Sequence, residues 1–139
     1  MLNFLKIIDE ILDKYNTDDP FIIAEKLGFP VQRCELNNYN GKSVYSNNNT
    51  TLFVNNNLNI IDSLITCAQE LGYALMYPKR SAIFIHNNSK NNKCKEEINC
   101  NNFAIALLIE NKFNFEDNYS PLTTLTLIEG IKNGTIINQ

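Results

Sequence analysis

The sequence predicts one α+β domain that spans residues 1–139. Three observations support this fold class. Apolar residues recur at helical spacing near the N-terminus, short strand-like segments separated by asparagine-rich turns follow, and long helical patterns come after them. The length suits one compact domain, and a hydrophobic content of 44% is enough to form a core.

The N-terminal part of the chain predicts two helices. Apolar residues from Leu5 to Tyr15 recur at helical spacing, with acidic residues on another face. A second helix is expected to begin at Asp19 and Pro20, because an Asp cap followed by Pro is a strong start signal. Gly28 suits the left-handed conformation that ends this helix.

The next part of the chain predicts a small sheet. The segments Val31–Leu36, Ser43–Ser46 and Thr51–Val54 have strand-like composition, and asparagine-rich turns separate them. The simplest interpretation is a three-stranded antiparallel meander.

Helical patterns dominate the rest of the chain. A long helix over Leu58–Tyr77 has a wide apolar face and ends before Pro78. A short strand over Ser81–Ile85, a helix over Glu96–Ile109 and a last helix over Pro121–Ile131 complete the expected elements.

Composition narrows the possible partners and the compartment. The net charge is −3, and the basic residues are scattered, so direct binding to nucleic acid is not expected. No apolar stretch is long enough to cross a bilayer, and no export signal is present. The four cysteines form no CxxC pair, which favours free thiols in a reducing cytoplasm.

The most informative segment is Ala68–Pro78, with the sequence AQELGYALMYP. With histidine in place of Gln69, Tyr73 and Tyr77 it would read AHELGHALMHP, which resembles the active-site helix of the ImmA/IrrE metallopeptidases. In the HExxH pattern two histidines one turn apart hold one zinc ion, and the glutamate accepts a proton from the metal-bound water.

Three further segments extend this resemblance over residues 17–110. Asp19–Gly28 is similar to a "DPFEIAEKLG" element of the family, and Thr51–Asn55 resembles the edge strand before the active-site helix. Asn99–Leu108 resembles a downstream "EANxFAxxLL" helix, whose glutamate is the third zinc ligand in the family. The resemblance therefore implies a small sheet, a zincin-like active-site helix and a following ligand helix.

This sequence departs from the family at each ligand position. Gln69 and Tyr73 replace the two histidines, and Asn99 replaces the ligand glutamate. Only Glu70 remains of the catalytic set. Amides are poor zinc ligands, and a tyrosine would have to ionise from a pKa of about 10. No metal or other cofactor is therefore expected, although zinc serves active relatives, and no residue is expected to be catalytic.

A second route to a metal site uses His86, Cys94, Cys100 and either Glu96 or Glu97. Their spacing matches no familiar site. Glu97 is also a poor replacement for a ligand at position 99, because two helical positions turn a side chain by about 200°. Cys100 and His86 could form a nucleophile pair, but no third residue is available to orient the histidine.

Two uses of the vacated positions remain open. Gln69, Tyr73 and Tyr77 share one helix face, and together with Asn99 they could form hydrogen bonds between two helices in place of the metal. The same four residues could instead line a peptide-binding groove, since tyrosines offer flat apolar area with a polar end.

These patterns favour a catalytically inactive, metallopeptidase-like protein that acts by binding another protein. The resemblance implies a helix-turn-helix repressor of a phage or mobile element as the first partner to test, because active relatives cleave such repressors. One alternative is an active zinc endopeptidase with atypical ligands that cleaves a repressor. Another is a purely structural or interaction module, and the oligomeric state stays open.

Overall fold

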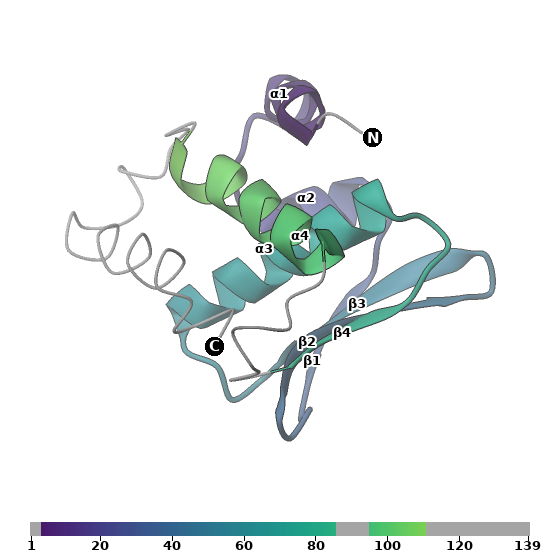
Figure 1. The fold of residues 1–139 in the computed structure, drawn as a ribbon. Helices are drawn as coiled ribbons and strands as arrows, with labels where there is room; N and C mark the ends of the chain where they lie inside the picture. The colour runs from purple at the N-terminus through teal and green to yellow at the C-terminus, as the bar shows by residue number, and fades with distance from the viewer. Residues whose placement is uncertain (1–3, 86–94, 111–139) are drawn as a thin grey trace.

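The computed structural model describes residues 4–85 and 95–110. Helices α1, α2, α3 and α4 stack on one face of a sheet, so that the described part of the chain forms two layers (Figure 1). The predicted α+β class is confirmed. In chain order the elements are α1 (Phe4–Tyr15), α2 (Pro20–Lys26), β1 (Val31–Cys34), β2 (Tyr39–Ser46), β3 (Asn49–Asn55), α3 (Ile60–Met76), β4 (Ala82–Ile85), α4 (Lys95–Ile105) and the π-helical segment η2 (Ala106–Glu110).

The sheet is mixed, and the predicted three-stranded antiparallel meander is wrong. Its strand order is β1-β3-β2-β4. Strands β2 and β3 form an antiparallel hairpin, whose turn uses Asn47 and Asn48 at φ of 54° and 64°. Strand β3 then lies between β2 and β1 and pairs in parallel with β1, so that Val31 is opposite Leu52. The sequence predicts the asparagine turn between β2 and β3, but it does not predict that β1 pairs with β3.

Strand β4 adds a fourth strand to the sheet. It pairs antiparallel with β2 and lies at the edge opposite β1. The predicted strand over Ser81–Ile85 is therefore confirmed with a boundary one residue later. The predicted helix over Pro121–Ile131 lies outside the described residues.

Helix α2 has the ends that its sequence predicts. The Asp19 side chain accepts a hydrogen bond of 2.9 Å from the Phe21 backbone N–H, and Pro20 occupies the first helical position. Gly28 has φ of +89°, a conformation that favours glycine. These caps fix the point at which the chain turns from α2 into β1.

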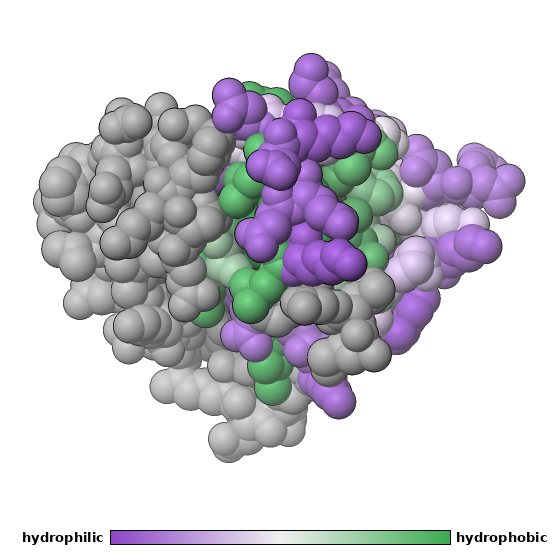
Figure 2. Space-filling model, turned by 90° about the horizontal axis from the view of Figure 1, so that it is seen from above, coloured by the Kyte–Doolittle hydropathy of each residue, from purple (hydrophilic) through white to green (hydrophobic). Residues whose placement is uncertain are grey.

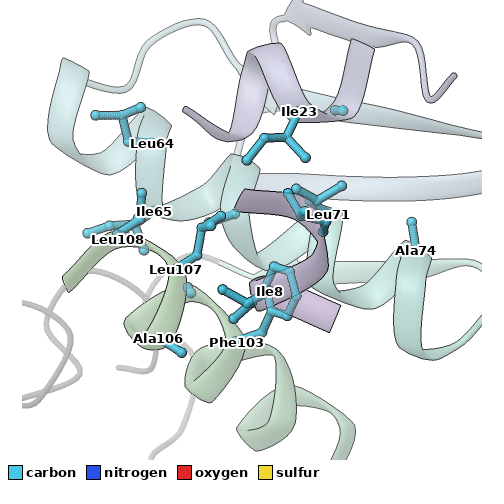
Figure 3. Close-up of a cluster of buried hydrophobic side chains, with 14 of the residues drawn as sticks. Ile8, Ile23, Leu64, Ile65, Leu71, Ala74, Phe103, Ala106, Leu107 and Leu108 are labelled. Carbon is cyan, nitrogen blue, oxygen red and sulfur yellow. The ribbon is translucent and has the colours of Figure 1, made fainter. Parts of the chain in front are cut away.

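Helix α3 runs through the centre of the core. It begins at the cap Asn59, which accepts a hydrogen bond of 2.8 Å from the Asp62 backbone N–H. Apolar side chains from α1, α2, α3, α4 and η2 converge around it, with Phe103 and Leu71 near the middle (Figure 3). A Cβ on Gly72 would lie 2.8 Å from the Phe103 ring, so glycine is required for this approach of α3 and α4.

The helical side of the molecule has a mixed surface. Seen from this side, hydrophobic side chains form narrow strips between hydrophilic ones (Figure 2). Within the described ranges, no helix has the length and apolar character needed to span a membrane.

Candidate functional site

The vacated ligand positions lie where α3 packs against α4. Gln69 and Tyr73 are 1% and 3% exposed, whereas Tyr77 and Asn99 are only partly buried. The two positions that correspond to the zinc-binding histidines of HExxH therefore lie in the interior. The other two lie nearer the surface.

Gln69 forms a buried hydrogen bond between the two helices. Its side-chain amide donates to Oδ1 of Asn101, which is 6% exposed. Asn101 was not among the residues predicted for the site. It does match the asparagine of the "EANxFAxxLL" pattern, and this match is the signal that could have identified it. An amide pair therefore joins α3 to α4 beside the expected metal position.

Asn99 does not bond to the residues at the two histidine positions, as a third metal ligand would approach them, but to Tyr77. Its Nδ2 donates a hydrogen bond of 2.8 Å to the hydroxyl of Tyr77. The Tyr73 hydroxyl donates over 3.3 Å to the backbone carbonyl of Ser81, ahead of β4. The rings of Tyr73 and Tyr77 lie 5.1 Å apart between centroids. The four predicted residues thus form one neighbourhood, with Asn99 bonded to Tyr77 rather than to Gln69.

Arg80 and Glu96 border this neighbourhood on the solvent side. The Arg80 guanidinium lies 5.3 Å from the centre of the Tyr77 ring and forms an ion pair with Glu96 on α4. The segment after α3 is thereby tied to the start of α4. Both charged side chains keep substantial exposure, 51% and 35%, so this ion pair contributes little to stability.

Glu70 lies on a different face of α3, against β2. The side chain is completely buried, and Oε2 would lie 3.0 Å from a Cβ on Gly41. The hydroxyls of Ser43 and Thr66 are buried nearby, and neither they nor the Glu70 carboxyl oxygens form a hydrogen bond within the described structure. Burial raises the pKa of Glu70 well above its ordinary value of 4.5, and the nearby Ser43 hydroxyl lowers that pKa only in part.

This donor set does not fit a zinc ion. The Gln69 amide nitrogen points its protons toward Asn101, and amides and neutral phenols are weak zinc ligands. Among residues 4–85 and 95–110, no three His, Cys, Asp or Glu side chains are placed to hold a metal ion.

The alternative metal and nucleophile residues are only partly within the described chain. Cys100 is fully buried and packs with Tyr73, while Glu97 is 9% exposed on the α4 face that also carries Asn101. His86 and Cys94 lie outside the described residues. The described residues therefore do not test the Cys100–His86 pair, for which the sequence offers no third residue to orient the histidine.

Comparisons with known proteins place this geometry in a family. The model of the IrrE N-terminal-like domain, peptidase M78, matches residues 24–117, which include both α3 and α4. The chain belongs to this family. The resemblance predicted from the motifs is confirmed.

A phage protein gives a second comparison. The chain is 27% identical over 103 residues to "Uncharacterized immunity region protein 2" of Bacillus phage phi105. The match covers 73% of this chain and 65% of the phage protein, so the chain matches about two thirds of that relative's length. No solved structure matches the chain.

Proposed function

We propose that this chain is a catalytically inactive member of the M78 family that acts in the cytoplasm by binding a protein. The observation that carries the proposal is the buried hydrogen bond between Gln69 and Asn101. In Gln69 a neutral amide stands at a position where active relatives need a metal ligand, and its hydrogen bond to Asn101 joins the same two helices that a metal would join.

The state of Glu70 supports the same conclusion. A general base must reach the proton that it removes, directly or through one water molecule. Glu70 is 0% exposed and faces β2, with the Gly41 backbone against its carboxyl group. Burial also favours its neutral, protonated form, which cannot accept a proton.

The binding surface is proposed at the outer part of the vacated site. Tyr77 and Asn99 are partly exposed there, beside Arg80, whereas Gln69 and Tyr73 are buried. A tyrosine ring with an arginine beside it is typical of residues that contribute strongly to protein interfaces. Gln69 and Tyr73 would then hold the surface in shape without contacting the partner.

A transcription regulator is the proposed partner class. The phage relative is named an immunity region protein. The family resemblance adds that active members cleave helix-turn-helix repressors. An inactive copy could sequester such a repressor or compete with an active protease for it.

Zinc content tests the inactive state. The purified chain would be dialysed against trace zinc, and its metal measured by elemental mass spectrometry beside a relative with an intact HExxH motif. We expect about one zinc per chain in that relative and almost none here. Stoichiometric zinc in this chain, together with cleavage of a repressor that Glu70→Gln abolishes, would establish the active-endopeptidase alternative instead.

Partner binding needs a separate test. The helix-turn-helix regulator encoded nearest to this chain's gene would be titrated against the purified protein by calorimetry. We expect binding that Tyr77→Ala weakens by at least tenfold, while the distant, exposed substitution Ile60→Ala leaves it unchanged. Equal binding by both variants would exclude the outer part of the vacated site as the interface.

A further inference from the structure

Within residues 4–85 and 95–110, the edge of the sheet opposite the vacated site has an unpaired hydrogen-bonding face. In the described structure β1 pairs with β3 alone. The carbonyls of Pro30 and Cys34 accept hydrogen bonds from Leu52 and Asn56, so they face β3. Because backbone groups alternate along a strand, the N–H and C=O groups of Val31 and Arg33 face away from the sheet.

A hollow of about 630 Å³ lies beside this edge, between β1 and α2. Its apolar lining includes Phe21, Phe29 and Ile22, and Ile22 is 42% exposed. A four-residue strand forms few hydrogen bonds on its own, so the hollow would have to supply apolar contact for anything that docks here.

The charges of the hollow indicate what fits it. Glu25 and Arg33 both line it and are both exposed, yet they form no ion pair with each other. The Arg33 guanidinium lies 4.2 Å from the centre of the Phe21 ring, which holds it on the wall of the hollow. The hollow therefore presents one acid and one base, each able to meet an opposite charge.

We propose that β1 and this hollow form a two-fold interface with a second copy of the chain. A two-fold interface uses the same patch on both partners, so the patch must be self-complementary. A patch with apolar residues, one acid and one base meets this requirement, because Arg33 of each chain can face Glu25 of the other. The two β1 strands would pair antiparallel and join the sheets. This inference does not depend on the loss of the zinc ligands.

Charge exchange tests the pairing directly. Sedimentation velocity on the full chain, from about 1 to about 100 μM, should show a monomer–dimer equilibrium. Glu25→Arg and Arg33→Glu should each weaken dimerisation at least tenfold, because each places like charges opposite one another. An equimolar mixture of the two variants should restore dimers, since all the facing pairs are then opposite in charge.

A matched control separates this effect from a change of net charge. Glu10→Arg makes the same change of charge on the exposed face of α1, outside the hollow, and should leave dimerisation unchanged. Circular dichroism would verify that each variant is folded. A chain that stays monomeric up to about 100 μM overturns the proposal. So do dimers that both charge variants leave intact, or a mixture that fails to recover.

Discussion

Helix α3 has two faces with polar side chains, and these faces differ in whether the side chains have hydrogen-bond partners. Toward α4, Gln69 and Asn101 are paired by a hydrogen bond, and Tyr77 is bonded to Asn99. Toward β2, the carboxyl group of Glu70 is fully buried with no hydrogen bond in the described structure. The positions that bind metal in active relatives thus have hydrogen-bond partners outside the ligand set. The Glu70 carboxyl group, at the position of the catalytic base, has the Ser43 hydroxyl nearby but no hydrogen bond in the described structure.

This difference follows from the energetics of buried polar groups. A buried amide pair replaces the hydrogen bonds that both groups lose on leaving water, while an unpaired carboxyl bears the full cost of desolvation. The α4 face should therefore lose stability when it is altered. The β2 face should gain stability at neutral pH when the Glu70 carboxyl group is replaced by an amide, because an amide needs no proton to stay neutral.

The largest expected effect is the loss of stability in Gln69→Ala. The substitution removes the donor to Asn101 and leaves a small cavity in the interior, so the free energy of unfolding should fall by about 3 kcal/mol. Denaturant unfolding of Gln69→Ala, Asn101→Ala and the double variant would give the coupling between the two residues. A double variant whose loss equals the sum of the two single losses would contradict the pairing.

The second prediction concerns Glu70→Gln, which should raise the free energy of unfolding by about 2 kcal/mol at neutral pH. The folded-state pKa of Glu70 is raised, so the folded protein keeps a proton that the unfolded chain releases above about pH 4.5. The stability of the unaltered chain should consequently fall as the pH rises through this range.

Unfolding measured from pH 4 to pH 8 would check this sign. Glu70→Gln cannot titrate, so its advantage should grow toward higher pH. Glu10→Gln, an exposed control in α1 outside the hollow, should show no such growth. A Glu70→Gln variant less stable than the unaltered chain at pH 8 would show that the carboxyl group has a stabilising partner.

How far the sequence predicts this molecule depends on the range of the interactions involved. The ends of α2 follow from Asp19, Pro20 and Gly28, which are neighbours in the chain and act locally. The parallel pairing of β1 with β3 could not be predicted, because alternation identifies a strand without identifying its neighbour. The three-stranded antiparallel meander was predicted only as the simplest connection of three neighbouring strands, and β1 does not pair with β2.

The site shows the same division. Helical spacing correctly groups Gln69, Tyr73 and Tyr77 along α3, because that spacing is a property of one helix. The residue opposite Gln69 depends on how α4 crosses α3, which is set by the approach of Phe103 to Gly72. Spacing therefore gave no reason to choose Asn101 over Asn99.

Asp18 is a second buried carboxyl group with a raised pKa, and the pH dependence of its effect on stability can be compared with that of Glu70. Asp18 is 5% exposed, and burial raises its pKa from 3.8 to about 6, while a backbone hydrogen bond lowers it in part. The free energy of unfolding should therefore decrease as the pH rises from about 4 to about 6, because the folded protein holds a proton on Asp18 that the unfolded chain releases. Above about pH 6 this loss should level off. Asp18→Asn should therefore add about 1 kcal/mol at pH 7 and almost nothing at pH 4, as measured by denaturant unfolding. An equal gain at both pH values would assign the effect to packing instead of charge.

The smallest expected effect is that of Tyr77→Phe, which removes the hydroxyl that accepts the hydrogen bond from Asn99. Both residues are partly exposed, so water can replace the lost bond, and the free energy of unfolding should fall by only about 0.5 kcal/mol. Thermal unfolding of Tyr77→Phe and of Gln69→Ala would compare how much stability the outer and the inner hydrogen bond of this face contribute. If the two variants lost similar stability, the outer pair would be as important to the fold as the buried one. Tyr77 would then be a poor choice for a partner-binding residue, since its effect on binding could not be separated from its effect on folding.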